Sequence, residues 1–187
     1  RLQRVIGLDY SSAMLQAMQR KAHEAGLRNV ETLHMAWEDD WHEVPVCDIV
    51  VGGGGAPGGD SELARDKLQA KARLRVYLTH LVGGHFTDPA IQEAVGRHLP
   101  PVPDYIYLIN LLHRRSIHPQ LSYLNQDSRL AGAMDFEDFA RRVAWSMGGL
   151  SEDEMQSLRR WYERASPVQR EGAPMRWAFI SWEAGSA

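Results

Sequence analysis

An acidic residue follows a short apolar segment close to the start of the chain. Residues 4–8 read RVIGL, which is typical of a buried strand, and Asp9 comes directly after them. In open parallel sheets, ligands bind beyond the carboxyl ends of the strands. A carboxylate at such a position offers two acceptor oxygens to two hydroxyl donors. We therefore expect Asp9 to bind both ribose hydroxyls of an adenosine; the alternative is that it only caps the following helix.

The residues after this acid extend the candidate site. Tyr10 offers a flat apolar ring on which an adenine base can pack, and Met14 is expected either on the same wall or in the core. Ser11 is a candidate ligand contact and also an N-cap for a helix over residues 13–25, in which apolar residues recur at helical spacing. Gly26 is placed to end that helix in a left-handed conformation.

A second candidate site follows the next predicted strand, residues 30–35. There Ala36, Trp37 and Glu38 form the exit loop, and a polar or acidic side chain in it is suited to accept from an adenine amino group. The alternative is an ordinary loop without a ligand. Trp41, further along the same loop, is interpreted as a packing or solvated residue.

A glycine run supports a rival hypothesis. It follows a predicted buried strand at residues 46–51, and Gly53, Gly55 and Gly58 fit the G-x-G-x-x-G pattern of dinucleotide-binding loops. That pattern also requires an acid after the following strand, and the predicted strand at residues 76–82 lacks one. We therefore favour a flexible loop, with an NAD(P)-dependent oxidoreductase as the alternative.

Composition narrows the class of protein. The chain has 187 residues, 44% of them hydrophobic, and a formal net charge of −3, which gives no electrostatic basis for binding nucleic acid or an anionic membrane. The single cysteine, Cys47, excludes an internal disulfide and a cysteine-rich zinc site. No apolar run approaches the length of a membrane helix. These features predict a soluble, cytoplasmic protein; they do not predict its oligomeric state.

The histidines do not suggest a metal site. His80 and His85, like His113 and His118, are spaced by five residues, which does not place both rings on one helical face. We interpret them as loop or strand-end residues rather than metal ligands. A general base at His80 or His85 remains an open alternative, because both follow a strand on the side where a substrate is expected.

The order of predicted elements indicates an α/β fold. Further helices are expected at 61–74, 89–99, 105–115, 136–147 and 151–164, and further strands at 118–124 and 175–183. The helices between residues 136 and 164 are expected to form either a lid over a substrate or a cover for the sheet. The sheet is expected to carry helices on both faces.

This order resembles the class I S-adenosylmethionine-dependent methyltransferases. VIGLDYSSAML looks like the second strand of that family with its ribose-binding acid, NVETLHMAWED like the third strand and its adenine loop, and CDIVV like the fourth strand. The resemblance implies a single domain over residues 1–187 with a Rossmann-like three-layer sandwich, a mostly parallel sheet and an antiparallel last strand.

The resemblance also implies a function and a site. The cofactor would be S-adenosylmethionine, no metal would be needed, and a methyl group would pass to a small molecule that the sequence does not identify. Asp9 would hold the ribose, Tyr10 and Trp37 or Glu38 would flank the adenine, and residues near Gly52 would border the sulfonium. The Asp9 segment carries most of this resemblance.

One part of the family pattern is not in the sequence. The first strand of the family, and the glycine-rich turn after it, would lie before residue 1. We therefore expect about 50 further residues upstream, by analogy with the size of βαβ units. Without them, the remaining hypothesis is a non-enzymatic or inactive fragment.

Overall fold

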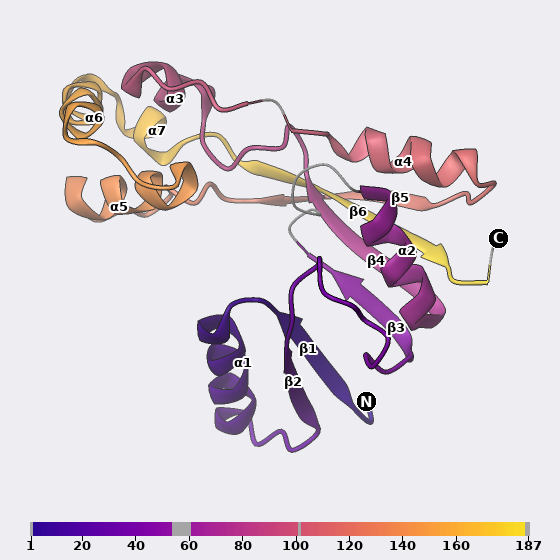
Figure 1. Cartoon of the computed structure of the whole chain (residues 1–187). Coiled ribbons are helices and arrows are strands. Elements are labelled where there is room, and N and C mark those ends of the chain that lie inside the picture. The colour runs from indigo at the N-terminus through magenta and orange to yellow at the C-terminus, as the bar shows by residue number, and fades with distance from the viewer. Residues whose placement is uncertain (1, 54–60, 101, 186–187) are drawn as a thin grey trace. The chain divides into compact units, whose positions relative to one another are not determined.

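The computed structural model describes residues 2–53, 61–100 and 102–185, and the chain divides into two compact units, Arg1–Pro45 and Val46–Ala187 (Figure 1). The first unit contains strand β1 (Val5–Asp9), helix α1 (Ser12–Glu24) and strand β2 (Val30–His34). The two strands pair in parallel, with Asp9 opposite His34. That both units form one domain stays a prediction.

Local signals set both ends of α1. The Ser11 hydroxyl accepts a hydrogen bond from the backbone N–H of Met14, as an N-cap does. Gly26 has φ of +67° and ends the helix in the left-handed region, where the Leu27 N–H donates to the Ala22 carbonyl at 2.8 Å. The predicted cap and the predicted glycine terminus are both confirmed.

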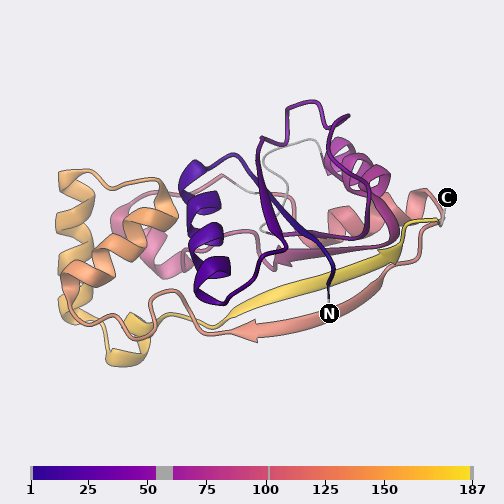
Figure 2. The ribbon, with the colours of Figure 1, turned by 90° about the horizontal axis from the view of Figure 1, so that it is seen from below.

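The second unit is built around a four-stranded sheet in the order β3-β4-β6-β5. Its strands are β3 (Cys47–Gly52), β4 (Ala72–Leu81), β5 (Gln120–Gln126) and β6 (Met175–Glu183). Its helices are α2 (Ser61–Lys71), α3 (Pro89–Val95), α4 (Tyr105–Arg114), α5 (Phe136–Met147), α6 (Glu152–Arg164) and α7 (Pro167–Glu171). Strands β5 and β6 run side by side along their length (Figure 2).

The sheet of the second unit is mixed. Strands β3 and β4 are parallel, whereas β6 is antiparallel to both β4 and β5. The antiparallel direction of the last strand agrees with the sequence prediction. The prediction of a mostly parallel sheet holds only in part, because inserting β6 between β4 and β5 makes two of the ladders of this sheet antiparallel.

Two further expectations need correction. Strand β3 was predicted to be buried, yet Ile49 and Val51 are 45% and 70% exposed, because β3 is the edge strand of its sheet. The helix predicted over residues 61–74 ends at Lys71, since the following residues already pair in β4. Helix α7 was not predicted; Ser166 and Gln169 form a capping box around it.

Helices α3, α5 and α6 share a hydrophobic core of their own. They gather with α7 beyond the carboxyl ends of β4 and β5 rather than over a face of the sheet (Figure 1). The buried members of this core are Ile91, Val95, Leu130, Phe136, Phe139, Ala140, Val143, Met147 and Leu158. Residues 136–164 were expected to form either a lid over a substrate or a cover for the sheet, and a cover for the sheet does not fit this arrangement. No helix in the described part of the chain is long and apolar enough to span a membrane.

An ion pair fastens α6 to the chain that follows α3. The Arg97 guanidinium donates to both carboxylate oxygens of Glu154 and, at 2.7 Å, to the Met147 carbonyl. These hydrogen bonds, together with one from the backbone N–H of Ser151, lower the pKa of Glu154 from 4.5 to about 2. A carboxylate with a lowered pKa stabilises the fold above its unfolded-state pKa, and that contribution is lost as the pH falls through its folded-state pKa.

We therefore expect Glu154→Gln to lower the melting temperature at pH 7 and to matter progressively less between pH 4.5 and pH 2. Glutamine keeps an oxygen for the capping box, so the variant isolates the charge. Thermal melts of both proteins across this pH range measure the effect, with Glu152→Gln in the same first turn as the control. A difference in melting temperature that does not change with pH would contradict the assignment.

Candidate functional site

Asp9 is the last residue of β1 and is half-buried. Its Oδ1 accepts a hydrogen bond from the Ser11 N–H at 2.8 Å, and no described residue hydrogen-bonds to Oδ2. The N-cap of α1 is Ser11, so the alternative role of Asp9 as the helix cap is not what the structure shows. One carboxylate oxygen braces the turn and the other remains available to a ligand.

The loop after β2 lies against this turn. The Met35 N–H donates to the Asp9 carbonyl at 3.1 Å, and Nε2 of His34 is 2.7 Å from the Tyr10 carbonyl oxygen. Because β1 and β2 are parallel, both loops leave the same edge of the sheet. The structure therefore brings the two predicted halves of the adenosine site together. His34 was missed from the sequence; its only signal was a polar residue at a strand end.

Trp37 is held as a rigid, half-exposed ring. It stacks on Trp41 with ring centroids 5.1 Å apart, and Trp41 Nε1 donates to the Ala36 carbonyl at 3.0 Å. The Ala36 N–H in turn donates to an Asp39 carboxylate oxygen at 2.7 Å. Trp41 itself is only 7% exposed, so it is the packing residue of this loop. Glu38 is exposed to solvent.

The first turn of α1 presents an apolar surface beside Asp9. Tyr10 is 74% exposed and Met14 is 61% exposed. Core packing of Met14 is therefore wrong: the buried face of this helix is formed by Leu15 and Ala22. Exposed aromatic and thioether side chains next to a carboxylate suit a flat base attached to a polar sugar.

Gly52 belongs to the second unit, at the end of β3. It is buried, and a Cβ there would lie 2.7 Å from Cδ1 of Leu78, its neighbour on β4. The structure thus gives this glycine a packing role. The dinucleotide pattern of Gly53, Gly55 and Gly58 falls largely on residues 54–60, which lie outside the described residues.

The histidines take separate positions. His80 lies one residue before the end of β4, and its Nδ1 is 3.0 Å from the Leu81 carbonyl oxygen. His113 and His118 contact each other edge to face, with centroids 5.1 Å apart. Within the described ranges, no group of three or more histidine, cysteine or acidic side chains could hold a metal ion.

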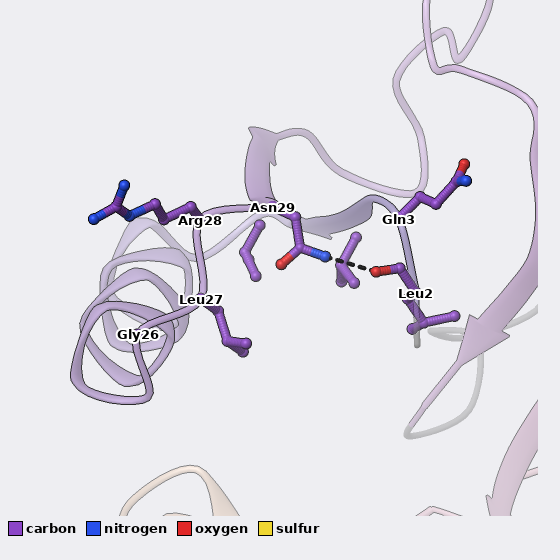
Figure 3. Close-up of a pocket in the computed structure, with 8 residues that line it drawn as sticks. Leu2, Gln3, Gly26, Leu27, Arg28 and Asn29 are labelled. Carbon is purple, nitrogen blue, oxygen red and sulfur yellow. Dashed lines mark hydrogen bonds between the residues drawn. The ribbon is translucent and has the colours of Figure 1, made fainter.

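A hollow of about 610 Å³ lies at the other end of the small sheet (Figure 3). Leu2, Leu27 and Val30 are among the residues that line it, and Asn29 Nδ2 donates to the Leu2 carbonyl at 2.9 Å. Strand β1 starts at this hollow and ends at Asp9. The hollow is therefore separate from the Asp9 site.

Comparisons with known proteins agree with this architecture. An uncharacterized protein of Haemophilus influenzae is 35% identical over 182 residues, which span 95% of this chain and 67% of that protein. No model of a known protein family matches the chain.

Three solved structures share the fold. A provisionally assigned methyltransferase from Bacillus halodurans has a TM-score of 0.58 at 10% identity, covering 97% of this chain and 83% of its own. Coclaurine N-methyltransferase, bound to N-methylheliamine and SAH, has a TM-score of 0.55 at 11% identity, covering 96% of this chain and 60% of its own. The [4+2]-cyclase SpnF has a TM-score of 0.51 at 12% identity, covering 96% of this chain and 66% of its own.

The fold is that of the class I S-adenosylmethionine-dependent methyltransferases. The chain belongs to the same family as the Haemophilus influenzae protein. The presence of a cyclase among the similar structures shows that the fold by itself does not fix the reaction.

Proposed function

We propose that this protein transfers a methyl group from S-adenosylmethionine to a small-molecule acceptor in the cytoplasm. The observation that carries the proposal is the carboxylate of Asp9, which lies at the carboxyl end of β1 with Oδ2 unpartnered among the described residues. Similarity to the fold of methyltransferases supports a cofactor-binding function for this edge of the sheet.

The residues around Asp9 fit an adenosine. Oδ2 is a free acceptor for ribose hydroxyls, and Tyr10 and Met14 supply exposed apolar surface beside it. Trp37 adds a ring held in place by Trp41. In this proposal Ala36 and Glu38 border the adenine, and the Ser11 N–H keeps the carboxylate oriented.

When bound, S-adenosylmethionine supplies an electrophilic methyl group on a positively charged sulfur. The chain's own contribution is positioning: Asp9 fixes the ribose through charge-assisted hydrogen bonds, and the aromatic rings fix the plane of the base. Orientation of this kind lowers the barrier without a dedicated nucleophile.

Asp9→Ala is expected to weaken binding of S-adenosylhomocysteine to the full chain by about 1–3 kcal/mol, because it removes a charge-assisted acceptor. Isothermal titration calorimetry measures this affinity directly. The matched control is Glu31→Gln, which removes a carboxylate from β2 that is bound to Arg4 near the other end of the same strands. It should leave the affinity unchanged.

The same titration separates the alternatives. Equal affinity of the Asp9→Ala variant would limit Asp9 to bracing its turn. Binding of NADH without binding of S-adenosylhomocysteine would favour an oxidoreductase and overturn the proposal. Binding of neither would favour a non-enzymatic role, whereas 1:1 binding of S-adenosylhomocysteine excludes it.

A further inference from the structure

A cluster of three aromatic rings and one arginine lies at the carboxyl ends of β4 and β5. Phe86 contacts Trp145 and Trp177, with ring centroids 5.9 Å apart in each pair. The guanidinium of Arg129 lies over two of these rings, with Cζ 3.9 Å from the centroid of Trp145 and 4.6 Å from that of Phe86. Distances of this kind are typical of cation–π contacts.

The cluster is fixed by the sheet and the helices together. Trp177 pairs with Leu81, the last residue of β4, and with Leu124 of β5. Its Nε1 donates to Oε1 of Gln126 at 3.1 Å. Arg129 follows β5 by three residues, and its own carbonyl accepts from Arg142 of α5 at 3.0 Å. A hydrogen bond from α5 thus fixes the backbone of Arg129, from which the guanidinium extends.

Arg129 contacts aromatic rings but forms no ion pair with an acidic side chain among the described residues. No carboxylate in the described ranges forms an ion pair with it, although its side chain is exposed and can reach solvent. By contrast, Arg159, which also lies over a ring, that of Phe136, pairs with Glu137 at 3.1 Å. Partial burial lowers the pKa of the Arg129 guanidinium, but an arginine remains charged at neutral pH.

We infer that Arg129 binds an anionic group, a carboxylate or a phosphate, on a small-molecule ligand. The inference rests on the cluster itself and does not depend on the proposed function. Ligands of open α/β sheets lie beyond the carboxyl ends of the strands, where this cluster stands. A guanidinium forms bidentate hydrogen bonds with either anion. The exposed ring of Trp145, at 61%, offers apolar surface to the rest of the molecule.

Calorimetric titration of the full chain with benzoate, phenyl phosphate and benzamide tests this inference. The three probes share a ring, so only the charged group differs. We expect benzoate or phenyl phosphate to bind and the neutral benzamide not to bind. Arg129→Gln should weaken binding of the anion at least about tenfold. Arg159→Gln, which removes a stacked arginine that already pairs with a carboxylate, should leave this binding unchanged. Arg129→Met also removes the charge while keeping a long apolar side chain on the rings, and serves as a second variant, with the same expected loss, if glutamine impairs folding.

The outcomes separate the two proposals. Binding of benzoate alone assigns a carboxylate ligand, and binding of phenyl phosphate alone assigns a phosphate ligand. If neither anion binds, if benzamide binds equally well, or if the Arg159 variant is weakened to the same extent, the inference is overturned. Affinity for S-adenosylhomocysteine is measured on the same samples and should not change in Arg129→Gln. Loss of anion binding with intact S-adenosylhomocysteine binding is therefore the supporting result, and failure of S-adenosylhomocysteine to bind the wild type counts against the proposed function only.

Discussion

Phe139→Ala is expected to lower the free energy of unfolding of the helical group by about 3–5 kcal/mol. The side chain is fully buried in the core shared by α3, α5 and α6. It contacts Tyr162 and Trp161 of α6, with ring centroids 4.9 Å and 6.0 Å away. Removing the ring leaves a cavity that Tyr162 cannot close, because its ring also packs against Phe136 and Arg170.

Urea denaturation followed by circular dichroism measures this loss, and hydrogen exchange locates it. Because the helical core is separate from the sheet, amides of α5 and α6 should lose protection more than those of β4 and β6. Met134→Ala is the control: that side chain is 84% exposed, so its loss should change stability by about 0.5 kcal/mol or less. Equal loss of protection in the sheet would mean that the two parts unfold together.

Trp182→Ala is expected to cost a similar amount, about 3–5 kcal/mol, in the sheet of the second unit. Trp182 lies on β6 opposite Val76 of β4 and is 2% exposed. Its Nε1 donates to Oε1 of Gln69 on α2 at 2.6 Å, so one side chain joins a helix to two strands. The variant loses both the buried area and the partner of a half-buried amide.

A conservative variant separates these two losses. Trp182→Phe keeps a buried aromatic ring but removes the hydrogen bond to Gln69 and part of the ring volume, so it should cost about 1 kcal/mol for the hydrogen bond in addition to the cost of the lost volume. Urea midpoints of the two variants and of the wild type provide the comparison. A Trp182→Phe variant as unstable as Trp182→Ala would show that the hydrogen bond, and not the packing, dominates.

Local signals explain why so much of the fold could be predicted. Helix α5 and strand β6 have the predicted bounds, and Ser151 caps α6 through the predicted capping box. Caps, left-handed glycines and apolar periodicity depend on neighbours a few residues away, which the sequence displays directly. The predicted burial of β3 failed for the opposite reason: whether a strand lies at the edge of a sheet depends on which segments pair with it.

The candidate site likewise has features that the sequence predicts and features that depend on tertiary packing. The sequence by itself placed Asp9 after a strand and Trp37 in the exit loop of the next, because each position follows from the order of elements along the chain. Three features depend on the tertiary structure. One Asp9 oxygen accepts a hydrogen bond from Ser11, the Met14 side chain is exposed, and Gly52 packs against Leu78.

The aromatic cluster around Arg129 was not predicted at all. Its rings come from the loop after β4, from α5 and from β6, and no spacing along the chain relates them. Strand order and helix packing bring them together. The sequence therefore determined the elements and the strand end that carries the cofactor hypothesis. Only long-range packing decided that, among the described residues, Arg129 lies over aromatic rings of the second unit without an acidic partner.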